Sequence, residues 1–245
     1  MKKLPSDRGE AASALMVEAK SHAKILGGFV GLLWLIQIVN SLIFNGALTD
    51  LGIQPRSFEG LRGILFAPFI HGSFTHLIAN TLPLAVLGWF VMLRQKRDLL
   101  TVSLFAALVG GLGVWLIAPA QTSTIGASGL VFGYLGYLLF RGIFERRFWP
   151  ILGSVVTFFA FGGLLYGVAP GTAGVSWQCH LFGLLGGIIA ARWLTAKPAA
   201  QEAKRMPVGR RIPEIEAPRV RLPAEPSDDD DTEEELARMK ARLPR

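Results

Sequence analysis

Six apolar segments, each about as long as a bilayer is thick, limit what this chain can fold into more than any other feature of its sequence. A helix rises ~1.5 Å per residue, so about 20 apolar residues cross a hydrocarbon core roughly 30 Å thick. We therefore predict an all-α membrane protein with six spanning helices, at about residues 25–44, 76–93, 99–118, 126–144, 151–168 and 179–194.

The composition fits a membrane domain with polar ends. Hydrophobic residues make up 51% of the chain, charged residues 18%, and the mean hydropathy is +0.42, which is too apolar for an ordinary soluble domain. We predict an N-terminal tail at 1–24, a membrane domain at 25–195, and a charged, largely disordered tail at 196–245. Within that last tail, residues 232–243 form either a short amphipathic helix or solvated chain.

Lysine and arginine alternate between the two sides of the predicted membrane domain. They are abundant in both tails and in the turns after the second and fourth segments, and scarce in the other connections. By the positive-inside rule, both termini are cytoplasmic. This topology explains the net charge of +7 without a nucleic-acid partner. The single cysteine, Cys179, excludes an intrachain disulfide and is expected to be a small buried residue.

The first connection, residues 45–74, is long enough to suggest a function of its own. It contains an apolar patch, 64–70, that is too short to span a bilayer and is interrupted by Pro68. We therefore expect this loop to lie in or near the membrane interface.

Polar residues open three of the six predicted helices at the same depth. In the predicted topology the second, fourth and sixth helices begin on the extracytoplasmic side, and their first turns contain His76 and Asn80, Ser128, and His180. Polar groups within membrane segments are costly and face the bundle interior. Their convergence at one level predicts a functional site.

The chemistry that fits these residues is nucleophilic catalysis by serine. Ser128 stands between Gly126 and Gly129, and His180 would take its proton as general base. His76 and Asn80 share one helix face and would, with the Ser128 backbone N–H, stabilise an oxyanion. No Asp or Glu occurs in the apolar portions of the segments, so we predict a dyad.

Glycines in the fourth and sixth segments permit the close helix contact that such a dyad requires. Gly129 and Gly133, and likewise Gly183 and Gly187, are spaced as small-xxx-small pairs. Ordinary helix packing would use the same pattern, so the glycines support the geometry and leave the reaction open.

The chain resembles the rhomboid family of intramembrane serine proteases. Residues 126–129 resemble the Gly-x-Ser-Gly nucleophile motif, residues 180–187 are similar to the sixth-helix His-x-x-Gly-x-x-x-Gly, and His71, His76 and Asn80 match the residues that open the second helix. The resemblance covers roughly residues 25–195 and implies a six-helix rhomboid bundle in a bacterial plasma membrane. It also implies transmembrane protein substrates and no cofactor.

By the same resemblance, Ser128 is the nucleophile, His180 the base, and His76 and Asn80 oxyanion donors, while His71 helps to order the first loop. Two departures stand out. Phe132 replaces a tyrosine that packs on the catalytic histidine in many relatives, keeping the ring and losing the hydroxyl. The Trp-Arg pair common in the first loop is not evident, and Arg62 is the nearest basic candidate.

Three other functions compete with proteolysis. An inactive rhomboid-like scaffold would bind membrane clients, although such proteins typically lack the serine or the histidine. A channel or transporter would need a polar path or inverted repeats, and no corresponding halves are visible. A metal site could use His71, His76 and His180, yet no carboxylate or His-Glu-x-x-His helix accompanies them.

Overall fold

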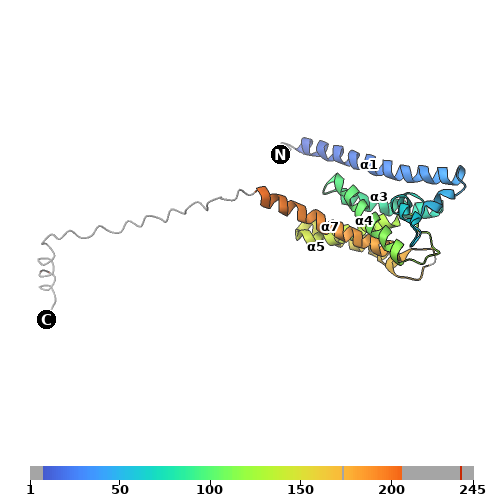
Figure 1. Cartoon of the computed structure of the whole chain (residues 1–245). Coiled ribbons are helices and arrows are strands. Elements are labelled where there is room, and N and C mark those ends of the chain that lie inside the picture. The colour runs from blue at the N-terminus through green and yellow to red at the C-terminus, as the bar shows by residue number, and fades with distance from the viewer. Residues whose placement is uncertain (1–7, 173, 206–237, 239–245) are drawn as a thin grey trace. The chain divides into compact units, whose positions relative to one another are not determined.

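The structure, a computed structural model, describes residues 8–172, 174–205 and 238, and in them it contains helices and one isolated antiparallel bridge, Ile53 with Thr124. Figure 1 shows the long helices. They are α1 (Arg8–Leu42), α3 (Phe74–Met92), α4 (Lys96–Ile117), α5 (Ser128–Glu145), α6 (Phe148–Phe161) and α7 (Trp177–Arg205). Short helical turns complete the order: η1 (Ala47–Leu51), η2 (Glu59–Arg62), α2 (Gly63–Phe66), η3 (Ala67–Phe69) and η4 (Gly162–Val168).

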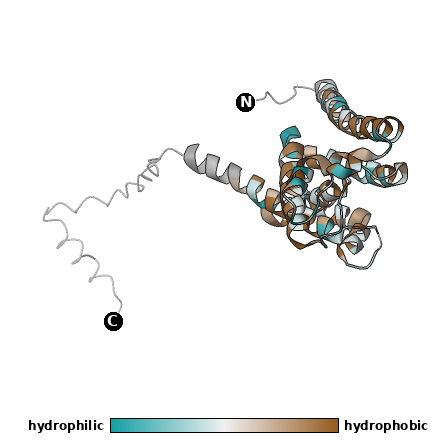
Figure 2. Ribbon diagram, turned by 45° about the vertical axis from the view of Figure 1, so that its right-hand side comes forward, coloured by the Kyte–Doolittle hydropathy of each residue, from teal (hydrophilic) through white to brown (hydrophobic). Residues whose placement is uncertain are grey.

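Five helical segments of the described chain are long and apolar enough to cross a membrane: Ala12–Leu42, Phe74–Met92, Lys96–Ile117, Phe148–Val168 and Trp177–Ala196. Figure 2 shows the hydrophobic colouring along these helices. The prediction of an all-α membrane protein is therefore confirmed. A helix lies in each of the six predicted segments, but α5 is not among the five, so the count of six spans stays a prediction.

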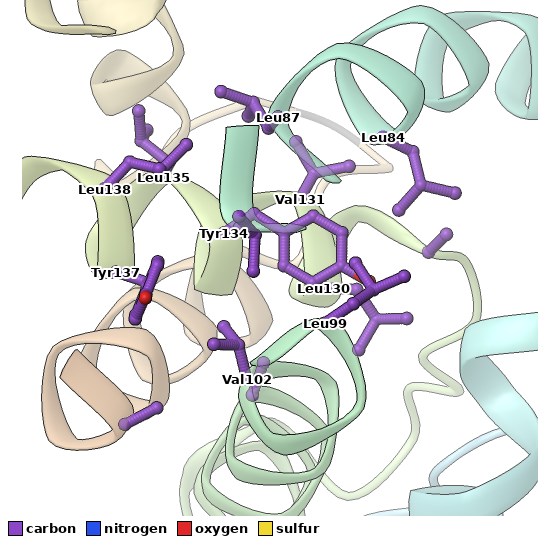
Figure 3. Close-up of a cluster of buried hydrophobic side chains, with 14 of the residues drawn as sticks. Leu84, Leu87, Leu99, Val102, Leu130, Val131, Tyr134, Leu135, Tyr137 and Leu138 are labelled. Carbon is purple, nitrogen blue, oxygen red and sulfur yellow. The ribbon is translucent and has the colours of Figure 1, made fainter. Parts of the chain in front are cut away.

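Helix α5 is largely surrounded by protein. It packs against α3, α4 and α6, and its Tyr134, Leu135 and Tyr137 are fully buried. Figure 3 shows the apolar side chains gathered around Tyr134. The Tyr134 hydroxyl lies 2.7 Å from Ser103 Oγ on α4, so this buried polar group is satisfied. A helix with protein on most sides can carry polar groups that a lipid-facing helix cannot.

Helix α6 is the opposite case, because nearly all of it faces outward. Its only buried residue is Thr157, and Phe159 is 82% exposed. Its first half is tied to α5 through Ser154, whose hydroxyl donates to the Leu138 carbonyl at 2.7 Å. Exposed apolar side chains of this kind suit a hydrocarbon environment.

The first turn of α4 contains a buried carboxylate, which lies just before the predicted start of this helix at residue 99. The helix begins at Lys96, which places Asp98 inside it with no exposed side-chain area. Arg94 contacts both oxygens of Asp98, at 2.7 and 3.0 Å, and the Tyr137 hydroxyl donates at 3.4 Å. Tyr137 lies about 13 Å along α5 from Ser128, at ~1.5 Å per residue. Asp98 is therefore beside the middle of α5, well away from Ser128 at its start.

Two predicted boundaries differ from the helices observed. Helix α1 begins at Arg8, so most of the predicted N-terminal tail is helical, and α7 runs to Arg205, past the predicted end at 195. The predicted amphipathic segment 232–243 lies outside the described residues except for Arg238. The division into tail, domain and tail stays a prediction.

The first loop folds back on the bundle and is tied to the end of α4. Arg56, whose φ is 58°, donates from its backbone N–H to the Trp115 carbonyl at 3.0 Å and from its guanidinium to the Leu116 carbonyl at 3.1 Å. The Trp115 indole donates to the Ser57 carbonyl at 2.8 Å. Arg56, rather than Arg62, is thus the arginine that anchors this loop.

The apolar patch of the loop has two faces. Ile64, Ala67 and Ile70 are buried against the protein, whereas Leu65 and Phe66 are 61% and 49% exposed. One face therefore contributes to packing and the other is available to lipid. Insertion of the loop into the membrane interface stays a prediction.

Candidate active site

Ser128 is the first residue of α5, directly after a glycine turn. Gly126 has a φ of 110°, which L side chains rarely adopt, and a Cβ there would lie 2.6 Å from the His76 ring. Gly126 is therefore required both by its backbone conformation and by the close approach of His76. This turn places the start of α5 beside His76 of α3.

Backbone hydrogen bonds from the first loop hold the segment before Ser128. Ile53 and Thr124 exchange two bonds, of 2.9 and 3.0 Å, and the Gly126 N–H donates to the Ala67 carbonyl at 2.8 Å. The Ala127 N–H donates to His71 Nε2 at 3.2 Å. Sequence patterns do not reveal backbone pairing between such distant segments, which is why our sequence analysis missed it.

His71 is fully buried and serves this segment as a hydrogen-bond acceptor. Because Nε2 accepts from Ala127, it carries no proton in this arrangement. Burial, together with His76 at a ring distance of 5.0 Å, lowers the pKa of His71 to about 4. His71 is thus neutral near pH 7, and the nitrogen that faces Ala127 is not free to bind a metal ion.

We expect this buried histidine to make the protein less stable in acid. Its pKa is about 4 when folded and near 6.5 when unfolded, so the unfolded chain takes up a proton first. The free energy of unfolding should be greatest above pH 6.5 and fall by a few kcal/mol as the pH drops towards 4, at ~1.4 kcal/mol per pKa unit. Thermal unfolding in detergent at about pH 4.5 and about pH 7.5 measures this loss.

The matched variant is His71→Gln, whose side-chain oxygen can still accept from the Ala127 N–H but does not titrate. It should lose less stability between the two pH values than the parent does. Equal losses in both proteins would show that His71 is not the responsible group.

His180 lies in the first turn of α7 and is held on two sides. Its ring stacks on Phe132 of α5, with centroids 4.0 Å apart and planes 9° from parallel, and its Nδ1 lies 2.9 Å from the Gly167 carbonyl. The replacement of tyrosine by phenylalanine at residue 132 therefore retains the ring contact with the histidine.

Asn80 and His76 lie one turn apart on α3. The α3 helix is capped by Ser73, whose hydroxyl accepts from the His76 N–H at 3.1 Å. Asn80 is 7% exposed, and its amide nitrogen donates to the His76 carbonyl at 3.2 Å. An amide nitrogen has two N–H donors, so this bond leaves one for another acceptor.

An open cavity of about 740 Å³ brings the predicted residues together: His76, Asn80, Ser128, Phe132 and His180 all line it. His71, Gly126, Gly129 and Gly183 support it from outside its lining. The polar part of its wall includes residues that our sequence analysis did not single out: Thr122, Ser123, Thr124, Ser176 and Gln178. None of the described residues in the lining is acidic.

Glycines allow α5 and α7 to touch through their backbones. A Cβ on Gly183 would meet the Gly129 carbonyl oxygen, and a Cβ on Gly187 would meet that of Gly133. A Cβ on Gly129 would lie 2.8 Å from Cys179 Sγ, a free and buried thiol. The small-residue contact predicted between these helices is therefore present, and it sets Ser128 and His180 on adjoining helices.

The described residues thus form an all-helical membrane protein with a serine and a histidine facing one cavity. A family model of the rhomboid domain matches residues 59–197, more than half of the chain. The chain belongs to the rhomboid family of intramembrane proteases.

Relatives of this chain come from several organisms. An uncharacterized protein of Mycobacterium tuberculosis is 41% identical over 177 residues, which are 69% of this chain and 73% of that protein. A second, from Mycobacterium leprae, is 41% identical over 176 residues, 69% of each chain. The rhomboid protease GluP of Bacillus subtilis is 32% identical over 146 residues, 58% of this chain and 28% of that protein.

Proposed function

We propose that this protein is an intramembrane serine endopeptidase that cleaves single-span membrane proteins near the extracytoplasmic end of their helix. The observation that carries the proposal is the shared cavity, which Ser128 and His180 line together with His76 and Asn80. Membership of the rhomboid family supports the reaction class. Ser128 is the proposed nucleophile and His180 the proposed base.

The proposed reaction has two steps. Ser128 Oγ bonds to the substrate carbonyl carbon while its proton passes to His180 Nε2, and that proton then goes to the leaving amine as the C–N bond breaks. Water next attacks the acyl group, giving its proton to His180, and Ser128 recovers a proton as the acid product leaves. His180 is neutral again after each step.

The negative charge of the tetrahedral intermediates needs nearby donors. Asn80, His76 and the Ser128 backbone N–H are the proposed oxyanion site. The free N–H of the Asn80 amide and its position in the cavity lining support this role. The cavity is open to solvent, which is required if water is to take part in the second step.

We propose six spanning helices, with α5 as the fourth, and both termini on the cytoplasmic side of a bacterial plasma membrane. The distribution of basic residues supports this orientation. Exposed Arg146 and Arg147 follow α5 at its end opposite Ser128, and exposed Lys96 and Arg97 begin α4. The mycobacterial relatives support a bacterial setting.

Labelling with a serine-directed fluorophosphonate tests the reaction class without a known substrate. Purified parent protein should be labelled covalently, and Ser128→Ala should not, because the probe bonds to an activated hydroxyl. Ser123→Ala, which removes another cavity hydroxyl, is the matched control and should be labelled like the parent. A parent that folds and is not labelled would favour the inactive scaffold instead.

Asn80→Ala should lower turnover while leaving substrate binding nearly intact. An oxyanion donor acts chiefly in the transition state, and loss of one donor typically costs about 3 kcal/mol, roughly 100-fold in kcat. Steady-state cleavage in proteoliposomes separates kcat from KM. Normal kcat with a raised KM would contradict the proposed role and point to ground-state substrate binding.

A further inference from the structure

His180 has two ring nitrogens, and the structure defines the partner of the one that the dyad does not use. Nδ1 lies 2.9 Å from the backbone carbonyl oxygen of Gly167, in η4. A carbonyl oxygen can only accept a hydrogen bond, so Nδ1 must carry the proton in this contact. The neutral ring then has its lone pair on Nε2, the nitrogen that a base for Ser128 requires.

A carboxylate performs this orienting task in serine hydrolases that use a triad, where it holds the histidine tautomer and stabilises the imidazolium. No described residue lining the cavity is acidic, and Asp98 is engaged by Arg94 and by Tyr137, which lies about 13 Å along α5 from Ser128. The Gly167 carbonyl, with its partial negative charge, faces the same nitrogen that a triad carboxylate would face.

The space around Gly167 explains why a residue without a side chain stands there. A Cβ at this position would lie 2.9 Å from Phe132 Cζ and 3.0 Å from His180 Nδ1. Its φ is outside the left-handed region, so contact with these two rings, not backbone conformation, demands the glycine. Gly163, in the same helical turn, has open space around its Cβ position.

The carbonyl belongs to a segment that is only partly buried, with Leu164 and Leu165 packed against the core. The η4 segment has no buried residue, and it follows α6, which buries only Thr157. Displacement of η4 would withdraw the carbonyl from His180, while Phe132 would keep its place in the buried face of α5. The orientation of the base is thereby made dependent on how η4 docks.

We propose that the Gly167 carbonyl is the positioning group that takes the place of a triad carboxylate, fixing His180 as the Nδ1–H tautomer so that Nε2 can act as base. The inference rests on the proposed function. It adds Gly167, which lies between α6 and α7, to the proposed site residues on α3, α5 and α7. Gly167 acts through His180 and does not touch the substrate.

The test compares Gly167→Ala with Gly163→Ala, which adds the same methyl group in the same segment. Gly167→Ala should lower both the rate of fluorophosphonate labelling of Ser128 and kcat by about 100-fold, because a displacement of about 1 Å can have that effect. KM for a single-span substrate should stay within about twofold, since the substrate contacts are unchanged. Gly163→Ala should match the parent in all three measurements.

A second measurement does not depend on activity. In parent protein with ¹⁵N-labelled histidine, NMR should show His180 protonated at Nδ1 and unprotonated at Nε2, with His180→Ala identifying the signals. A parent that fails to react while showing this tautomer would count against the dyad and not against the contact. Parental labelling by Gly167→Ala, or an Nε2–H tautomer in the parent, would overturn the proposal.

Discussion

Ser128→Ala and His180→Ala should each abolish cleavage, and the double variant should be hardly worse than either one. Both residues serve a single chemical step in the proposed reaction, and residues that act as a unit show strongly non-additive losses. In comparable serine hydrolases such losses reach about 10⁶-fold. The measurement is cleavage of a panel of single-span substrates in proteoliposomes, with small or helix-breaking residues near the outer end of the substrate helix.

Neither substitution should unfold the protein. Ser128 is the first residue of its helix, and His180 is only partly buried beside the open cavity, so neither loss leaves a large void in the core. Equal thermal unfolding of parent and variants provides the control. The dyad would be wrong if Ser128→Ala cleaved any substrate at the parental rate. Losses that multiplied in the double variant would show that the two residues act separately.

Gly187→Ala should push α5 away from α7 and lower both the free energy of unfolding and the rate of cleavage. Its Cβ would meet the Gly133 carbonyl oxygen and lie 2.9 Å from the Tyr137 nitrogen, and neither backbone group can rotate away. Overpacking in a dense interior typically costs about 1–3 kcal/mol. Because Ser128 and His180 stand on these two helices, a shift of about 1 Å would lower kcat by about 100-fold as well.

Gly153→Ala is the matched control for this substitution. It adds the same methyl group within α6, where the Cβ position has nothing within 4 Å. Its melting temperature and turnover should equal those of the parent. If Gly187→Ala behaved in the same way, backbone contact between α5 and α7 would not be what holds the site together.

Apolar segment length was enough to predict the helices, because the bilayer imposes a minimum span that short-range sequence patterns reveal. It was less able to predict their ends. Helix α4 includes Asp98 since Arg94 and Tyr137 neutralise and satisfy that carboxylate, an effect of neighbours that hydropathy cannot anticipate. In α1, polar residues from Arg8 onward continue the helix, which shows that loss of apolarity does not end it.

The candidate site also has one part that the sequence predicted and another part that it did not. Its side chains could be selected from the sequence because polar groups are expensive in a membrane segment, which makes His76, Asn80, Ser128 and His180 conspicuous. The glycine spacing likewise predicted which helices meet. Backbone partners carry no such signal, so neither the Gly167 carbonyl beside His180 nor the pairing of Ile53 with Thr124 was predicted.

The sequence by itself determined a helical membrane protein, the family to which it belongs, and the side chains available for chemistry, because each of these follows from local composition and spacing. Only the tertiary structure decided which loop supports the serine, that Arg56 anchors this loop to α4, and which nitrogen of His180 is bound by a carbonyl. These contacts join segments far apart in the chain through backbone groups that nearly every residue has. Their pairing depends on how the helices pack and not on residue type.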